Sequence, residues 1–320
     1  MDISEQIGVT QTPGEEEPFL ELAPALVEKR RSQARIIFDR FMRNKIAVAG
    51  AVFLILLVAF CFLGPYITGH NKPDVIHSDV MTAQDYLNGG KPPSLQFPFG
   101  TDDLGRDELA RVMAGGQVSL LVGFASMLMA LVFGVGIGAF AGFYGGVIDN
   151  ILMRVTDIAL AVPAYLLLFV LSASFTDGTP KSIIILIAIF SWTYAARLVR
   201  GEFLALKQRE FVLASRTIGA KNFSLMFRHI LPNAAGPIIV NATLLIGANI
   251  IFESILSYFG FGIRPPSSSW GNLINLGQNL IDVNPLLTFV PGAFIFLTVL
   301  SFNLVGDGLR DALDPYMTER

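Results

Sequence analysis

The side chains that could carry out chemistry in this 320-residue chain are few and widely spaced. His70, Asp74 and His77 lie close together in the sequence, and side chains of these types bind metal ions. Their segment is rich in proline and turn residues, so we expect solvated histidines there rather than a metal site. The sequence offers no Ser–His–Asp set, no metal-binding spacing and no pair of intramembrane carboxylates. We therefore expect a chain without enzyme activity.

Nucleotide chemistry would require a phosphate-binding loop, and the glycines of this chain do not form one. The pattern G-x-x-x-x-G-K-S/T is absent. Gly134, Gly138, Gly142 and Gly146 instead recur every four residues, at the end of an apolar run. Small residues at this spacing form a strip along which another helix can approach closely in lipid. We therefore predict helix packing at these glycines rather than nucleotide binding.

Three charged residues, Asp149, Arg154 and Asp157, lie between the second and third apolar runs. Such charges are costly in the middle of a bilayer but common at its surface. We predict a cytoplasmic turn whose charges pair across helices. A proton relay remains an alternative.

The composition indicates the kind of protein that must position these residues. The chain is 52% hydrophobic and only 15% charged, whereas a soluble domain carries about 25% charge. This deficit indicates a protein with several membrane spans, and the net charge of −3 gives no reason to expect nucleic acid as a partner. Cys61 is the single cysteine, so no intrachain disulfide can form. The first apolar run begins near Ile46, behind a charged segment, which favours a first span over a cleaved signal peptide.

The apolar runs predict an all-α membrane protein with six transmembrane helices. We expect a tail with a basic flank at 1–45, a first helix at 46–68, an external loop at 69–113, five more helices within 114–306, with a loop at 200–229, and a C-terminal tail at 307–320. Basic residues before the first span and in the loop place both termini in the cytoplasm. The five later spans are expected at about Val118–Phe143, Ile158–Phe175, Ser182–Val199, Ala234–Ser254 and Leu286–Leu304.

One basic segment between two apolar runs differs from the rest of the chain. It spans Arg209–Asn233 and reads REFVLASRTIGAKNFSLMFRHILPN. Phe211, Ala214 and Ile218 recur at i, i+3 and i+7, which places them on one face of a short helix, and Gly219 is typical of a helix end. A helix of about nine residues is marginal alone in water. If its flanks are membrane spans, its apolar face requires another protein at the membrane surface.

This segment resembles the cytoplasmic loop of ATP-binding-cassette (ABC) importer permeases. The family pattern is E-A-A, three residues, G, nine residues, then I-x-L-P. Here Leu213-Ala214-Ser215 takes the place of the triplet, Gly219 follows at the right distance, and His229-Ile230-Leu231-Pro232 closes the pattern. Leu213 and His229 depart from it, and the closing Arg228–Asn233 resembles the dipeptide, oligopeptide and nickel branch of the family.

Four further segments resemble the same branch, in the same order along the chain. The resemblance covers about residues 97–316, and the moderate loop before the second span is similar to that of the C-type member of a permease pair. The segments are Phe99–Asp107 (F-G-T-D-x-L-G-R-D), Tyr144–Pro163 (Y-x-G-G, D, M-R, D, A-x-P), Leu256–Gly271 (L-S-F-L-G-L-G, P-P, S-W-G) and the ending Asn303–Pro315.

The resemblance implies a type I permease in a bacterial or archaeal inner membrane. The implied partners are a second permease, two ABC ATPase subunits that bind ATP and Mg²⁺, and an external binding protein that delivers a di- or oligopeptide. The chain itself would bind no cofactor. Its short cytoplasmic helix would dock on an ATPase subunit, and ATP-driven closure would move the fourth and fifth spans together. The residues implied in coupling are Glu210, Phe211, Ala214, Ser215, Arg216, Ile218, Gly219 and Ala220.

Asn241, Thr243 and Asn249 place polar groups inside the fifth span. Polar residues within a span face a bundle or a pore. They are candidates for lining the translocation path, and hydrogen bonds between helices are the alternative.

Two alternative functions remain open at this point. The same permease design serves importers of nickel or other small solutes. An ion-coupled secondary transporter would need ionisable groups deep in its spans, or an internal repeat that contains broken helices. We expect no deep carboxylate here, which disfavours the secondary transporter.

Overall fold

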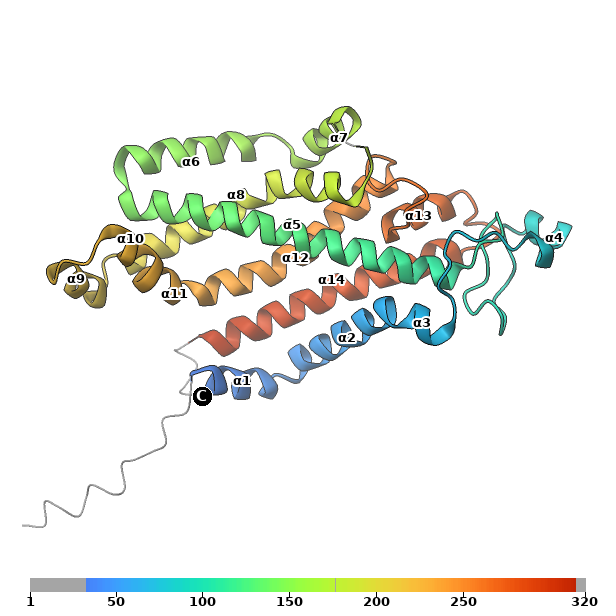
Figure 1. Ribbon diagram of the computed structural model, residues 1–320, viewed down its shortest axis with the longest axis horizontal. Helices are drawn as coiled ribbons and strands as arrows, with labels where there is room; N and C mark the ends of the chain where they lie inside the picture. The colour runs from blue at the N-terminus through green and yellow to red at the C-terminus, as the bar shows by residue number, and fades with distance from the viewer. Residues whose placement is uncertain (1–32, 176, 315–320) are drawn as a thin grey trace, which may run out of the picture.

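The computed structural model describes residues 33–175 and 177–314, and its long helices lie side by side along the longest axis of the molecule (Figure 1). Of the tail predicted at 1–45, residues 1–32 lie outside the described residues, and α1 occupies most of the remainder. The helices in chain order are α1 Gln33–Arg43, α2 Lys45–Phe62, α3 Gly64–Thr68, the 3-10 turn η1 Ser78–Val80, α4 Ala83–Leu87, α5 Glu108–Tyr144, α6 Gly146–Ala161, α7 Ala164–Phe175, α8 Pro180–Leu206, α9 Glu210–Thr217, α10 Asn222–Ser224, the π-helix η2 Leu225–Ile230, α11 Leu231–Asn233, α12 Ala235–Tyr258, α13 Trp270–Gln278 and α14 Leu286–Leu313.

The predicted all-α membrane fold is confirmed, with one span of unexpected form. Over the described residues, five helices (α2, α5, α8, α12 and α14) are long and apolar enough to cross a bilayer. The predicted third span, Ile158–Phe175, is not one straight helix. It falls across α6 and α7, which are bent by 83° at their junction. Val162 is extended there (φ −86°, ψ 133°), as a residue before proline prefers, so Pro163 separates the two helices.

Two other predicted boundaries differ from the structure. The loop expected at 69–113 ends earlier, because α5 begins at Glu108 and Asp107 caps it by accepting a hydrogen bond from the Leu109 amide at 3.0 Å. The tail expected from residue 307 is helical as far as Leu313, since α14 continues beyond its predicted end. This last part of α14 packs on the start of α2: a Cβ added at Gly308 would lie 2.2 Å from the Ala47 Cβ.

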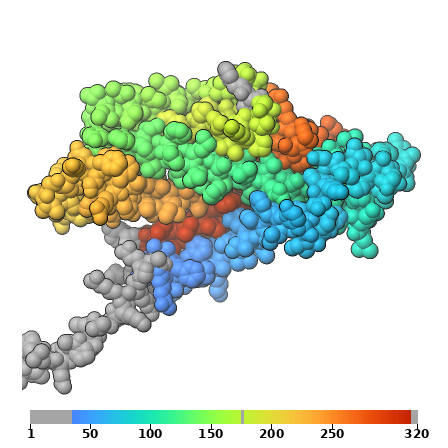
Figure 2. Space-filling model, in the orientation of Figure 1, coloured from blue at the N-terminus to red at the C-terminus, as the bar shows by residue number. Residues whose placement is uncertain are grey.

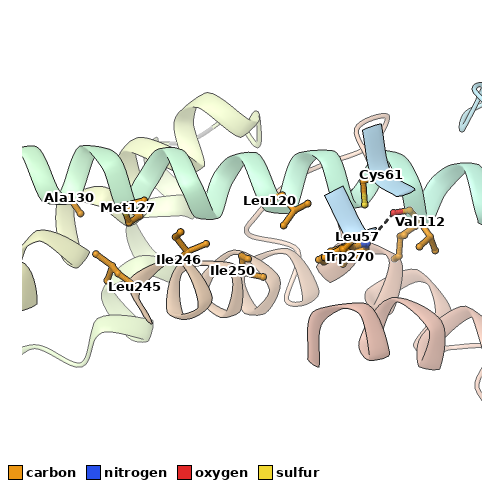
Figure 3. Close-up of a cluster of buried hydrophobic side chains, with 11 residues drawn as sticks. Leu57, Cys61, Val112, Leu120, Met127, Ala130, Leu245, Ile246, Ile250 and Trp270 are labelled. Carbon is orange, nitrogen blue, oxygen red and sulfur yellow. Dashed lines mark hydrogen bonds between the residues drawn. The ribbon is translucent and has the colours of Figure 1, made fainter. Parts of the chain in front are cut away.

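The largest buried cluster lies between α5, α12, α2 and α13 (Figure 3). Trp270 is its bulkiest member and is fully buried. Its indole N–H donates to the Val112 carbonyl at 3.0 Å, which gives this polar atom the partner that burial demands. Its ring stacks on Phe294 of α14 at 5.8 Å between centroids. Trp270 therefore joins α13 to both α5 and α14.

The glycine strip predicted on α5 is confirmed for three of its four members. Of the helix pairs in the described chain, α5 and α8 make the most extensive contact. A Cβ added at Gly134, Gly138 or Gly142 would lie 2.4–2.6 Å from atoms of α8, so only glycine permits this approach. Gly146 has no such neighbour and a φ of +56°. It is the first residue of α6, directly after Gly145 at the turn from α5, and its positive φ favours glycine.

The bundle has two distinct ends. One end, called here the α9 end, carries α9, α10, α11, α1 and the end of α14 (Figure 1). The opposite end, called the α4 end, carries α3, α4 and α13. The segment around α9 projects from the bundle in the space-filling view (Figure 2).

Candidate functional site

Helix α9 is short and begins and ends as its sequence predicts. Arg209 is extended at its N-terminus (φ −73°, ψ 148°), Glu210 lies in the first turn and Arg216 in the last. A negative charge near the N-terminus and a positive charge near the C-terminus interact favourably with the helix dipole, so both residues stabilise the helix. The chain turns at Gly219 with a φ of +88°, a conformation suited to glycine. The Gly219 amide donates to the Arg216 carbonyl and the Ala220 amide to that of Ser215, which closes the helix end.

Val212 attaches α9 to the bundle, although it was not among the coupling residues predicted from the sequence. Its side chain is fully buried, in a cluster with Phe143 of α5, Phe203 of α8 and residues of η2 such as Met226. A displacement of α9 would therefore be transmitted to α5 and α8 through packed side chains. The missed signal was the valine's own periodicity, because it lies about 100° around the helix from Phe211.

The predicted coupling residues lie mostly on the open surface of α9. Phe211, Ala214 and Ile218 are exposed, Ile218 to 86%. The adjacent Leu213 is also exposed, so the apolar surface is wider than the predicted face. Glu210, Arg216 and Gly219 are exposed, whereas Ser215 and Ala220 are half-buried. No other part of the described chain covers this surface, and its role in coupling stays a prediction.

The connection from α9 to α12 is helical and tightly anchored. It includes a π-helix, η2, an uncommon element found mostly as short insertions near functional sites. Leu225, Met226 and Ile230 of η2 are buried in the cluster that holds Val212. The expected Ile230-Leu231-Pro232 ending therefore fixes α9 relative to the start of α12.

Two of the three predicted charges, Asp149 and Asp157, pair with α8 as expected, but they lie on a helix rather than in a turn, and Arg154 is exposed. The Arg200 guanidinium donates two hydrogen bonds to the Asp149 carboxylate, one of them at 2.7 Å. Arg197 donates to Asp157 at 2.6 Å in a half-exposed pair. All four residues lie within α6 and α8. These ion pairs account for the contacts of Asp149 and Asp157, so a proton relay is not needed to explain them.

Removing the Asp149–Arg200 pair is expected to loosen α6. Because the pair is bidentate but partly exposed, we expect Asp149→Ala to lower the free energy of unfolding by about 1 kcal/mol. The reversed double variant Asp149→Arg with Arg200→Asp is expected to recover part of that loss. A double-mutant cycle measured by thermal unfolding in detergent tests this. Strictly additive effects of the two single changes would show that the pair contributes nothing.

The polar residues of α12 have unequal surroundings. Asn249 is fully buried, where its amide donates to Ser126 of α5 at 2.9 Å and its oxygen accepts from Ser191 of α8 at 2.7 Å. Hydrogen bonding between helices, the alternative interpretation, thus accounts for Asn249. Thr243 donates to the Val240 carbonyl within α12. The Asn241 side-chain oxygen is buried without a hydrogen-bond partner, so its role in the translocation path stays a prediction.

A buried carboxyl group lies within α12, although the sequence analysis expected no deep carboxylate. Glu253 is fully buried and accepts hydrogen bonds from Ser119 of α5 at 2.8 Å and Ser257 at 2.6 Å. Those hydroxyls in turn accept from the Trp270 and Ile263 amides. The carboxyl group thereby ties the α12–α13 connection to α5. The fifth span was expected to stop at Ser254, which would have placed Glu253 at its end, whereas α12 continues to Tyr258.

The histidines near the α4 end do not form a metal site within the described residues. Expecting both to be solvated was wrong for His70, whose ring contacts the Asp107 carboxylate. His77 packs on the Phe97 ring at 5.3 Å between centroids. In the part of the chain that the structure describes, no three His, Cys, Asp or Glu side chains gather as metal ligands.

The Phe99–Asp107 motif attaches the preceding loop to the start of α5. Asp102 is buried and accepts from the Arg106 side chain at 2.7 Å and from Arg111 at 2.6 Å. Gly100 and Gly105 both have φ near +80° (+78° and +79°), which lets the chain reverse around that carboxylate. The motif thus fixes the loop to α5 through a paired buried charge.

Comparison with known proteins defines the class. A family model described as the binding-protein-dependent transport system inner membrane component matches residues 134–319. The chain belongs to this family of transporter permeases, and the matched residues include the end of α5 and the helices from α6 to α14, with α9 among them. A second model, the N-terminal TM domain of oligopeptide transport permease C, matches residues 32–93. The C-type resemblance is therefore confirmed, including the N-terminal helices.

Three similar proteins are permeases of peptide transport systems. The oligopeptide transport system permease protein OppC of Bacillus subtilis is 41% identical over 276 residues, covering 86% of this chain and 87% of the relative. The dipeptide transport system permease protein DppC of the same organism is 39% identical over 277 residues, covering 86% and 83%. The glutathione transport system permease protein GsiD of Pectobacterium atrosepticum is 38% identical over 298 residues, covering 93% and 96%.

A solved structure supports the fold. The inward-facing MetNI methionine ABC transporter matches with a TM-score of 0.51 at 18% identity, covering 62% of this chain and 95% of that chain. At this identity the likeness shows the fold alone. The chain thus has the helical arrangement of an ABC importer permease.

Proposed function

We propose that this chain is the C-type permease of an ABC importer of di- or oligopeptides. The observation that carries the proposal is the α9 surface: an exposed apolar face backed by Val212, which is buried in one cluster with residues of α5, α8 and η2. A helix with this form can receive force from a partner and pass it to the spans. Relatives that transport oligopeptides, dipeptides and glutathione support a peptide as cargo.

In this proposal the α9 end lies in the cytoplasm. Arg197, Arg200, Lys207, Arg209 and Arg216 gather around that end, in agreement with the positive-inside rule. Helix α1 and the end of α14 lie on the same side, and the α4 end faces the external binding protein. Two ABC ATPase subunits bind ATP and Mg²⁺, and a second permease completes the path. This chain contributes helices and no catalytic group.

The movement follows from how α9 is attached. ATP-driven closure of the ATPase subunits displaces α9, and Val212 transmits the displacement to α5 and α8, while η2 transmits it to α12. The path to the outside then opens by rigid-body motion of packed helices. Asn241, with its unpartnered oxygen, is the residue of α12 best placed chemically to contact a peptide.

Reconstitution tests the cargo and the partners together. The chain is purified from its native membrane with whatever subunits accompany it, and the complex is placed in proteoliposomes. We expect ATP-dependent uptake of a labelled tripeptide in the presence of the binding protein, and no ATP hydrolysis by this chain alone. Uptake of Ni²⁺ but not of peptides would refute the cargo, and ATP turnover by the isolated chain would refute its role as a non-catalytic subunit.

A further inference from the structure

Helix α1 has an apolar face that the described chain covers only in part. Phe41 packs on α14, where a Cβ added at Gly308 would lie 3.2 Å from its ring. The Arg40 guanidinium donates to the Asp314 carbonyl at 2.9 Å, which holds the helix in place. Phe38 and Met42, one turn apart on the neighbouring strip, remain 59% and 44% exposed. These two side chains form the uncovered strip of α1.

Basic side chains border this strip. Arg35 lies three residues before Phe38, on the same side of the helix, and Arg43 and Lys45 follow Met42. All three basic side chains are exposed. Asp39 is the only acidic residue in the α1 sequence, so the helix carries a net positive charge. The surface therefore combines exposed apolar groups with an excess of cations.

The strip continues onto the outward face of a membrane-crossing helix. Asn44 separates α1 from α2, accepting from the Ala47 amide at 3.1 Å and donating to Asp311 of α14. Directly beyond it, Ile46 is 65% exposed, and Ile55 and Leu56 are exposed further along α2. A helix that crosses a bilayer turns such a face to lipid. The exposed strip of α1 is thus the extension of a lipid-facing surface.

We propose that α1 binds anionic phospholipid of the membrane leaflet at the α9 end. Phe38 and Met42 enter the apolar layer, while Arg35, Arg43 and Lys45 reach the phosphate groups of the lipid heads with their long side chains. An ATPase subunit does not account for the arrangement as well, because the apolar strip is continuous with the membrane face of α2. Charge complementarity selects anionic over zwitterionic lipid.

Lipid-borne quenching tests this binding directly. Cys61 is buried, so Phe38→Cys provides the thiol for an environment-sensitive dye on the full chain. The labelled chain is reconstituted in phosphatidylcholine nanodiscs that contain either brominated phosphatidylglycerol or brominated phosphatidylcholine at equal mole fraction. We expect stronger quenching by brominated phosphatidylglycerol. The apparent affinity of the labelled chain for phosphatidylglycerol should fall by about 10-fold or more when Arg35, Arg43 and Lys45 are replaced by glutamine.

A matched variant separates local binding from overall charge. Lys72 in the loop after α3, Lys181 at the start of α8 and Arg264 in the loop before α13 are exposed basic residues outside α1 and α2. Their replacement by glutamine removes the same charge. The preference for phosphatidylglycerol should survive in that variant. Equal quenching by both lipids, or equal effects of the two triple variants, would overturn the proposal. Absence of quenching by either lipid would show that protein covers the strip, which also overturns it.

Discussion

Ala214→Glu is expected to reduce ATP-dependent uptake to background while the chain remains folded in the membrane. Ala214 is exposed on α9, so the change should leave the stability of the isolated permease within about 0.5 kcal/mol. Docking on an ATPase subunit would bury the new charge without a partner. A loss of about 3 kcal/mol, or about 100-fold in affinity, is typical of an unpaired charge at the centre of an interface.

The matched control introduces the same residue at the other end of the bundle. Ala83 is exposed at the start of α4, and Ala83→Glu should leave the ATPase subunits bound and the uptake driven by them intact. Both variants are compared for membrane level, for co-purification of the ATPase subunits and for uptake. Wild-type co-purification and uptake by Ala214→Glu would refute the docking role of α9.

Gly138→Val is expected to disrupt the bundle itself. A Cβ at this position would lie 2.4 Å from the Ala196 carbonyl oxygen and 2.8 Å from the Val199 Cβ. Because these are backbone and branched atoms of a packed helix, α8 must move away from α5. Overpacking of this kind costs about 3 kcal/mol, and more where neighbours cannot relax. We expect little folded protein by size-exclusion chromatography and a large loss of thermal stability.

Gly136 provides a control on the same helix. A Cβ there would meet nothing within 4 Å, so Gly136→Val makes the same change in helix propensity without the clash. The difference in unfolding temperature between the two variants measures the close approach of α5 and α8. Equal temperatures would mean that the glycine strip does not set the spacing of these helices.

Much of the fold could be predicted from hydrophobic runs and local signals. The apolar segments predicted the long helices because a helix must satisfy its own backbone within lipid. The four-residue spacing of Gly134, Gly138 and Gly142 predicted a close helix contact, although not that α8 was the partner. Pro163 is visible in the sequence, but the 83° bend also depends on how α7 packs on α8 and α12.

Less of the candidate site than of the fold could be predicted from the sequence. Helix α9 and its exposed residues follow from periodicity and Gly219, whereas the anchoring of Val212 depends on side chains more than 60 residues away, such as Phe143. Glu253 was placed at a span end because local sequence cannot show that Ser119 and the α13 segment surround it. Tertiary contacts, rather than local propensity, decide which polar residues within the spans have partners.

The side of the membrane on which α9 lies, and what covers it, can be measured at one position. Ile218→Cys provides an exposed thiol on α9, and Cys61 is buried. A membrane-impermeant maleimide is applied to sealed vesicles of each orientation, with the ATPase subunits present or stripped. The account predicts labelling only from the cytoplasmic side, with protection when the ATPase subunits are bound. Labelling from the external side, or equal labelling with and without those subunits, would contradict it.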